Sequence, residues 1–320
     1  MKLKRLRKLD YTETRRFAID QANRQLVKLG FQINQSLRSH NPEAVHDLRV
    51  AVRRFSQTLR VFKPCFRGKE MRKVRRELKD ITDLAGEVRN CDVALKLLSK
   101  SQKPEASPLR HRLEGRRREC ERALVGFLRH WIDRKSSARW RAAVQDAATV
   151  NSEPFGKAPI VTTAQRILPR VAREFFERGN RASKTKTAPA ELHRFRIASK
   201  RFRYTLELLT SLYGPQMKSF LEKIRRAQGL LGEINDCEMV RNLLSHYKDA
   251  DGLTSLLRKR QARKIQEFQR HWEGTFGTHR EMQSWSAFLR RPIERARQVK
   301  KPLTRAGPAQ AASRRSAAVA

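Results

Sequence analysis

Residues 46–59 read HDLRVAVRRFSQTL, and residues 193–206 read HRFRIASKRFRYTL. The two segments align without a gap, and His, Arg, Ala, Arg, Phe, Thr and Leu recur at the same positions. A second pair of blocks follows in the same order, LAGEVRNCD at 84–92 and LLGEINDCE at 230–238. Two matched blocks in one order indicate that the chain is a tandem duplication.

Helix signals dominate the rest of the chain. Between clusters of Gly and Pro, apolar residues recur at spacings of three and four, as in amphipathic helices. The predicted helices span 10–38, 42–63, 69–100, 109–148, 160–178, 189–211, 216–247 and 252–275. The segment 109–148 is long enough to contain a break, and an apolar patch at 285–289 can close the second set. The predicted fold class is all-α, with two tandem four-helix bundles.

The bundles define the expected domain organisation. A first half covers 1–150, with a basic extension at 1–9, and a second half covers 151–290 after a Pro-containing linker near 151–159. Residues 291–320 are rich in Arg, Lys, Ala, Pro and Ser, a composition that predicts a disordered basic tail.

The charge balance predicts the kind of partner. The chain of 320 residues has 72 Lys and Arg against 32 Asp and Glu, a formal net charge of +40, most of it outside the two ends. A hydrophobic fraction of 39% still supports a folded body. Such a surface attracts polyanions and disfavours calcium or small uncharged substrates.

Compartment signals are simple. No apolar run approaches the roughly 18 residues of a membrane helix, and the basic start leads into Asp10, Thr12 and Glu13 rather than a signal-peptide core. The four cysteines are widely spaced, with no zinc or disulfide pattern. We expect reduced, buried thiols in a cytoplasmic protein without a membrane association.

Each motif helix has a basic stripe opposite its apolar face. At about 100° per residue, the stripes comprise His46, Arg49, Arg53 and Arg60 in the first half, and His193, Arg196, Lys200 and Tyr204 in the second. The alternative explanation is an ordinary solvent-exposed polar face, which every amphipathic surface helix has. Two features argue against it: neighbouring like charges destabilise a helix, and the basic stripe occurs twice in the chain. The first stripe spans about 21 Å at 1.5 Å per residue. A binding site for a linear polyanion explains both features.

The residue types fit contacts with phosphate groups. Arg presents a planar fork of donors, Lys a compact charge, and His a donor whose protonation an anion favours. For each histidine alone, a cap or surface role is the alternative. Val50 and Ile197, at the edge of the stripes, are unexplained by this pattern.

The third helix of each half has a weaker stripe. Its members are Arg72, Arg76 and Lys79 in the first half, and Lys218 and Arg225 in the second. Glu222 interrupts the second stripe, so a solvated face with ion pairs at i,i+4 explains the pattern equally well.

The second repeated block contains carboxylates, Glu233, Asp236 and Glu238, that could serve metal binding or acid–base chemistry. Asn90 replaces Asp236 in the first half, which favours a structural role. We expect Gly86 and Gly232 to allow close helix approach, and the carboxylates to pair with arginines such as Arg54 and Arg201. The sequence lacks the phosphate-loop, dinucleotide, metalloprotease and serine-hydrolase motifs, so no enzyme activity, metal or cofactor is predicted.

At these blocks the sequence resembles the CHAD family, the conserved-histidine α-helical domain. The motif residues are HxLRVxxRRF at 46–55, HxxRIxxKRFRYxLE at 193–207, and the two LxGE blocks, and the resemblance covers about 10–290. The sequence departs from the family pattern at Asn90, where the family usually has an acidic residue. Some relatives also have a CYTH triphosphatase domain, and the acidic strand motif of that domain is absent here.

The resemblance implies two four-helix bundles related by pseudo-twofold symmetry, with basic faces lining a groove. It also implies binding of inorganic polyphosphate and, for some members, association with polyphosphate granules. The implied ligand contacts are His46, Arg49, Arg53, Arg54, His193, Arg196, Lys200, Arg201 and Arg203.

Three other functions compete with polyphosphate binding. A nucleic-acid-binding protein would have the same charge, but aromatic residues are only 7% of the chain and no helix-turn-helix or zinc-finger pattern appears. An enzyme acting on polyphosphate or nucleotides lacks the expected motifs. A scaffold for acidic proteins is the third alternative. The sequence favours a non-enzymatic polyphosphate-binding module.

Overall fold

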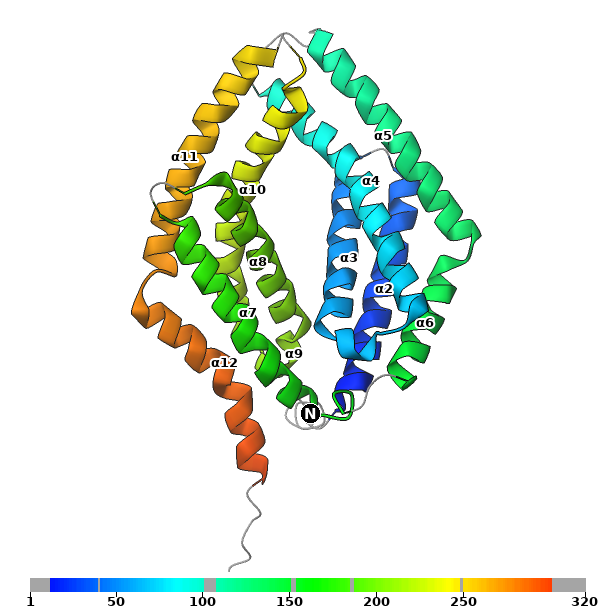
Figure 1. Ribbon diagram of the computed structural model, residues 1–320, viewed down its shortest axis with the longest axis vertical. Coiled ribbons are helices and arrows are strands. Elements are labelled where there is room, and N and C mark those ends of the chain that lie inside the picture. The colour runs from blue at the N-terminus through cyan, green and yellow to red at the C-terminus, as the bar shows by residue number, and fades with distance from the viewer. Residues whose placement is uncertain are drawn as a thin grey trace, which may run out of the picture.

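The computed structural model describes residues 12–39, 41–100, 108–150, 154–184, 187–247 and 250–300. Residues 149–150, 279 and 291–300 are described by their backbone alone. Helices make up nearly all of these ranges, which contain no β-strand. The all-α prediction is confirmed (Figure 1).

The first half follows the predicted order of helices closely. Its elements are α2 (Thr14–Arg38), α3 (Pro42–Val61), the 3₁₀ turn η1 (Lys63–Cys65), α4 (Lys69–Ser99), α5 (Pro108–Asp133) and α6 (Ser136–Val150). Asn41 starts α3 as its N-cap, because its side chain accepts a hydrogen bond from the backbone N–H of Glu43, and Pro42 occupies the first turn.

The second half has the same order with one short addition. Its elements are α7 (Ile160–Ala182), α8 (Pro189–Leu208), α9 (Thr210–Tyr213), α10 (Met217–Leu244), α11 (Asp251–Thr275) and α12 (His279–Lys300). Figure 1 shows α3 and α4 facing α8 and α10 across the middle of the molecule, with α5 and α11 on the two outer flanks.

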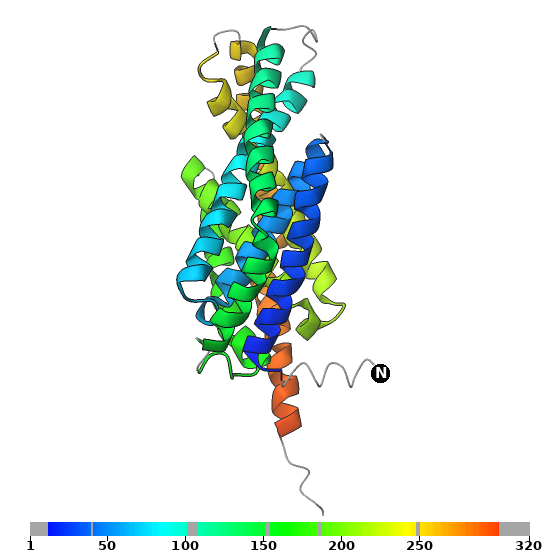
Figure 2. The same ribbon diagram turned by 90° about the vertical axis from the view of Figure 1, so that its right-hand side faces the viewer.

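The outermost helix of each half is divided in two. The segment predicted as 109–148 breaks at Arg134 and Lys135, where Lys135 adopts a positive φ of 49°. After the breaks, α6 packs against α2 and α12 packs against α7. Each half therefore has five long helices in the described residues, because the chain turns back to cover its own first helix. Figure 2, turned onto the first half, shows α5 extending along the long axis.

The C-terminal helix α12 continues past Arg290 to Lys300. The disordered tail predicted for 291–320 is therefore helical in its first part. Residues 294–298 read ERARQ, which are good helix formers. The rest of the predicted tail, 301–320, and the basic extension 1–9 lie outside the described residues.

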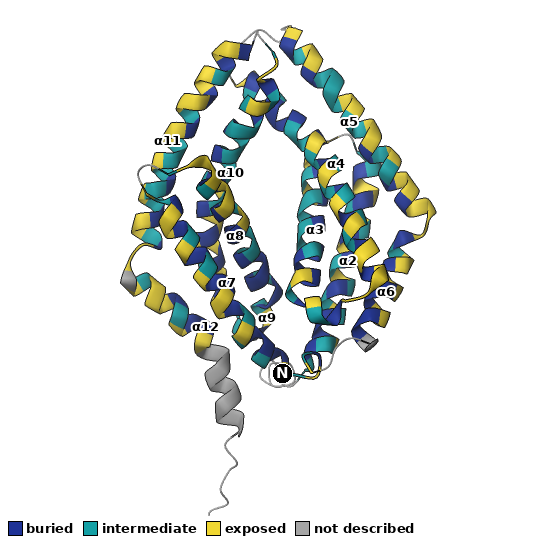
Figure 3. Cartoon of the chain, viewed as in Figure 1, coloured by how far each residue is buried: buried dark blue, intermediate teal, exposed yellow. Residues whose placement is uncertain are grey.

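The hydrophobic core contains residues of both halves. A large cluster extends over α2, α3, α4 and α6 on one side and α7, α8, α10 and α12 on the other. A smaller cluster joins the ends of α4 and α5 to the ends of α10 and α11. In the second half, Phe175 has five aromatic neighbours, with ring centroids at 4.8 to 5.4 Å, namely Phe176, Phe195, Phe202, Trp272 and Phe276. Exposed residues gather on the outer turns of α5 and α11 (Figure 3).

The halves also meet where α2 and α7 begin. The backbone N–H of Thr14 donates to the carbonyl of Ala158, and that of Ile160 donates to the carbonyl of Thr12, each at 2.9 Å. The hydroxyls of Thr14 and Thr163 lie 2.6 Å apart and share a buried hydrogen bond. The linker between the halves is thus held against the start of α2.

The cysteines are free, as predicted, and Cys65, Cys91 and Cys237 are buried while Cys120 is half-buried. Burial raises the pKa of the Cys65 thiol to about 11, so this thiol is unreactive. Within the described ranges, no helix has the length and apolar character needed to cross a membrane.

Candidate anion-binding cavity

The two motif helices, α3 and α8, contact each other between the halves. The Gln57 amide on α3 donates to the Thr205 hydroxyl on α8 at 3.0 Å, in a buried position. Near this contact, Arg54 Nε lies 3.3 Å from Glu207 Oε2. The apolar sides of both helices, including Phe55 and Phe202, are buried in the core. The fold therefore turns the two basic stripes toward the space between the halves.

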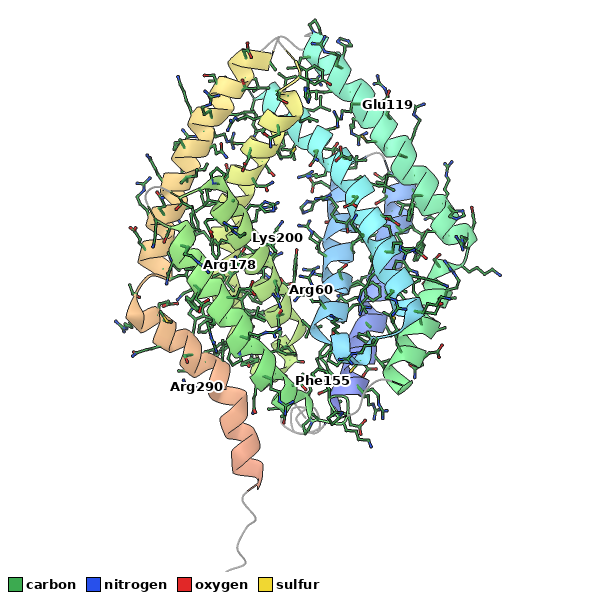
Figure 4. All side chains as sticks on the ribbon, in the orientation of Figure 1. Arg60, Glu119, Phe155, Arg178, Lys200 and Arg290 are labelled. Carbon is green, nitrogen blue, oxygen red and sulfur yellow. The ribbon has the colours of Figure 1, made fainter. Side chains whose placement is uncertain are left out.

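A cavity of about 750 Å³ lies beside this contact. Nine basic side chains line it, and no acidic one is among the described lining residues. They come from α3, η1, α4 and α8: Arg49, Arg53, Arg60, Lys63, Arg75, Lys79, Arg196, Lys200 and Arg201. Figure 4 labels Arg60 and Lys200, from opposite halves, beside the central space. Tyr204 and the previously unexplained Ile197 also line the cavity.

The centre of the cavity is electrostatically strained. Burial, reinforced by the charges of Arg196, Arg53 and Arg49, lowers the pKa of Lys200 to about 6. Burial and the neighbouring arginines, Arg53 first, lower the pKa of Arg49 to about 10. Burial is the largest cause of both shifts, and the neighbouring cations add to it while Asp236 opposes it. A bound anion would stabilise the charged form of both groups.

Local contacts orient the central arginines. Arg53 Nε donates to the carbonyl of Arg49 at 3.0 Å, one turn earlier in α3, and Arg49 Nη1 donates to the carbonyl of Thr82 on α4 at 3.4 Å. Arg196 Nε is buried and has no hydrogen-bond partner in the described residues. Its pKa is lowered by burial, against the attraction of Asp236. An unsatisfied buried donor in a basic cavity fits an anionic acceptor supplied by a ligand.

The predicted histidines lie away from this cavity. His46 is half-buried, and burial followed by the charge of Arg89 lowers its pKa. His193 is exposed and lines a second cavity of about 780 Å³, together with Glu87, Asn90 and five residues of α10 that include Glu238. The structure therefore brings together the arginines and Lys200 of the two stripes but leaves both histidines outside the lining of the first cavity.

Other predicted site residues divide into three groups. Lys79 lines the cavity while pairing with Asp83 at 2.8 Å, and Arg201 lines it while pairing with Glu174 at 2.9 Å. Arg72, Arg76 and Lys218 are exposed and do not line the cavity described above. Arg54, Arg203 and Arg225 gather around Glu207 instead, and the Arg203 guanidinium lies 4.7 Å from the centre of the Tyr204 ring.

Sequence reasoning missed Lys63 and Arg75. Arg75 is one turn before Lys79 on α4, and its Nη2 donates to the carbonyl of Phe66 at 2.7 Å. Arg75, Lys79, Thr82 and Gly86 are spaced by three or four residues and so lie on one face of α4. Counting back along the helix from Gly86 in the repeated block would therefore have predicted this stripe. Lys63 gave no periodic signal because it lies in η1.

The acidic block has other partners than expected. Glu87 pairs with Arg116 at 3.4 Å, and Glu233 pairs with Arg260 at 2.8 Å. The predicted pairing with Arg54 and Arg201 is wrong, because these arginines reach Glu207 and Glu174. Across the described ranges, no three His, Cys, Asp or Glu side chains are placed to hold a metal ion.

Gly86 makes room for a cavity arginine. A Cβ at this position would lie 2.9 Å from Arg49 Nη1, whereas a Cβ at the matching Gly232 would meet nothing within 4 Å. Gly86→Ala should therefore displace the Arg49 guanidinium, whose flexible end can move without disturbing the core.

We expect Gly86→Ala to weaken anion binding about tenfold, about 1.4 kcal/mol. The free energy of unfolding should stay constant or rise by up to about 1 kcal/mol, since alanine favours the helix. Gly232→Ala is the matched control and should show only the gain in stability. Denaturant unfolding and a binding titration measure both effects, and equal binding by the two variants would contradict this role of Gly86.

The fold and cavity define an all-helical protein whose two halves enclose a basic cavity. The chain belongs to the CHAD family, since the CHAD domain model matches residues 21–245.

A solved CHAD domain structure agrees with the fold. The crystal structure of the CHAD domain from the plant Ricinus communis is 18% identical, covers 88% of this chain and 92% of its own, and superposes with a TM-score of 0.64. PptA from Streptomyces chartreusis is 16% identical, with coverage of 90% and 100% and a TM-score of 0.47. No curated protein sequence matches the chain.

Proposed function

We propose that this protein binds inorganic polyphosphate in the basic cavity between its halves. The observation that carries the proposal is the lining of one cavity by nine arginine and lysine side chains, with no acidic side chain among the described lining residues. Membership of the CHAD family supports the same ligand, through the resemblance in the motif helices. Recruitment to polyphosphate granules would follow from the same binding.

A linear polyanion fits the cavity better than a single anion. The lining residues come from both halves and from successive turns of α3, α4 and α8, so the donors are spread along helix axes. One phosphate group can meet only a fraction of them, whereas a chain can meet many at once. Arginine forks suit the unesterified oxygens of each phosphate group.

Binding rather than catalysis is the proposed activity. No carboxylate or histidine is among the described residues that line the cavity, and these are the side chains that commonly activate a nucleophile or hold Mg²⁺ in phosphoryl transfer. Arg and Lys would instead neutralise and position the ligand.

Nucleic acid is the rival ligand, because the charge of +40 attracts any polyanion. Its bases require stacking surfaces, yet most large aromatic side chains lie in the core, including Phe175, Phe195 and Trp272. Duplex DNA is also far wider than a bare phosphate chain and would have to bind outside the cavity.

A competition titration tests the proposal. Long-chain polyphosphate should displace labelled duplex DNA or RNA at equal phosphate concentration, and nucleic acid should fail to displace labelled polyphosphate at roughly 150 mM salt, where non-specific contacts are weak. Orthophosphate should compete poorly. If duplex DNA displaces polyphosphate, the protein is a nucleic-acid-binding protein and the proposal is wrong.

A further inference from the structure

The sign of the charge at the end of the repeated motif differs between the two halves. The stripe residues Arg49, Arg53 and Arg54 recur as Arg196, Lys200 and Arg201, so the basic character is kept at each. At the end of the motif, however, Glu207 stands where the first half has Arg60. The second motif helix, α8, therefore has a carboxylate at the position where the first, α3, has the cavity residue Arg60.

Glu207 lies among three arginines. Its Oε2 is 3.3 Å from Arg54 Nε, and its Oε1 is 3.7 Å from Arg203 Nε and 3.8 Å from Arg225 Nη2. The arginines come from α3, α8 and α10. The Glu207 side chain is only 18% exposed, so the carboxylate is held inside the group.

This cluster is separate from the cavity. None of the four residues of the cluster lines the cavity. Helices α3 and α8 contribute to both places, but α4 completes the cavity whereas α10 completes the cluster. Figure 1 shows α4 and α10 belonging to opposite halves. In the sequence repeat, α3 corresponds to α8 and α4 corresponds to α10. The helices of the cluster are thus the counterparts of those around the cavity.

The chemistry of the cluster is that of an occupied anion site. A carboxylate accepts hydrogen bonds and charge from guanidinium groups much as a phosphate group does. One carboxylate leaves two of the three arginine charges uncompensated, and Arg203 Nε is buried without a hydrogen-bond partner in the described residues. A phosphate group would supply more acceptor oxygens than Glu207 does.

We propose that Arg54, Arg203 and Arg225 form a second phosphate subsite, which Glu207 occupies as a built-in competitor. The carboxylate confines tight binding to the acid-free cavity and so limits how many phosphate groups of one chain the protein engages. This inference rests on the proposed function, because it concerns the same ligand.

The primary test is Glu207→Gln, which keeps the side-chain size and removes the competing charge. Polyphosphate affinity, measured by titration from 50 to 300 mM salt, should rise about tenfold at 150 mM. The dependence of log affinity on log salt should steepen by about one unit or more, because each further phosphate contact releases counterions.

The matched control is Glu114→Gln on the flank helix α5, which makes the same charge change at a residue paired with Arg110 at 2.9 Å. It should leave the salt dependence unchanged. If Glu207→Gln behaves like Glu114→Gln while the wild type binds polyphosphate, the second subsite does not exist. If the wild type itself fails to bind, the proposed function is wrong.

A second pair of variants serves if Glu207→Gln does not fold. Arg60 is exposed, so its replacement leaves the core intact. Arg60→Glu would introduce into the cavity the carboxylate that the second half already has, and affinity should fall at least tenfold more than in Arg60→Gln. Equal losses in the two variants would overturn the idea that a carboxylate at this register competes with the ligand.

Discussion

Replacing both Arg49 and Arg196 by Glu should lower polyphosphate affinity by a factor of about 100 to 10,000. Each arginine comes from a different motif helix, and both line the same cavity. A hydrogen bond to a charged group contributes about 1.5 to 3 kcal/mol, so losing two such contacts removes about 3 to 6 kcal/mol of binding energy. The new carboxylates would also repel the ligand.

The fold should survive this double replacement. Both side chains are half-buried on the polar side of their helices, away from the aromatic core. The new carboxylates would lie near Arg53 and would favour the ammonium form of Lys200. Helicity by circular dichroism and the melting temperature should therefore change little, while a fluorescence titration at 150 mM salt reports the lost binding.

The control makes the same charge change at Arg314 and Arg315, in the C-terminal segment outside the described residues. A tail contributes to long-range attraction, which salt screens. We expect a modest loss that is greatest at low salt. Equal losses of affinity in the two double variants would mean that binding depends only on total charge, and would contradict a defined binding site in the cavity.

Lys200 should couple binding to pH more strongly than any other described residue of the cavity. With a pKa of about 6, its amine is largely neutral at pH 7.5 in the free protein. A bound polyanion stabilises the ammonium form and raises this pKa. The complex then holds more protons than the free protein, so affinity should increase as pH falls from 8 to 6, by up to about tenfold per pH unit for one proton.

Calorimetry at pH 7.5 in two buffers of different ionisation enthalpy measures this proton uptake. The wild type should take up close to one proton per bound site, and Lys200→Met should take up none and bind more weakly. Any pH dependence that persists in Lys200→Met would come from groups other than Lys200. An absence of uptake in the wild type would place Lys200 outside the bound ligand.

The same substitution should stabilise the free protein. Because the folded-state pKa of Lys200 lies below its unfolded value of 10.5, the unfolded chain binds more protons between about pH 6 and 10.5. Stability due to this residue therefore rises with pH through that window. Lys200→Met removes the buried amine, so we expect a melting temperature several degrees higher at pH 7 and a flatter pH dependence of stability. An unchanged melting temperature would mean that the site stores no electrostatic strain.

Most of the architecture was readable from local patterns. Apolar spacings of three and four, punctuated by Gly and Pro, predicted the helices to within a few residues at most ends, because amphipathic periodicity reflects which face is buried. The break at Lys135 and the continuation of α12 past Arg290 depended on packing against α2 and α7 and on helix propensity, which periodicity does not report. The repeated motifs also placed Arg49, Arg53, Arg196 and Lys200 on polar helix faces, and these four residues line the cavity.

The tertiary structure alone selected which polar groups meet. A helical wheel places His46 and Arg53 on one side of α3, but the direction of approach of α4 and α8 determines that Arg53 lines the cavity and His46 does not. The contact between Gln57 and Thr205 joins residues 148 positions apart, and Glu207 among its arginines depends on the same crossing. Sequence periodicity encodes the polarity of each helix face, whereas convergence of faces, burial and the resulting pKa of Lys200 arise only when the two halves pack together.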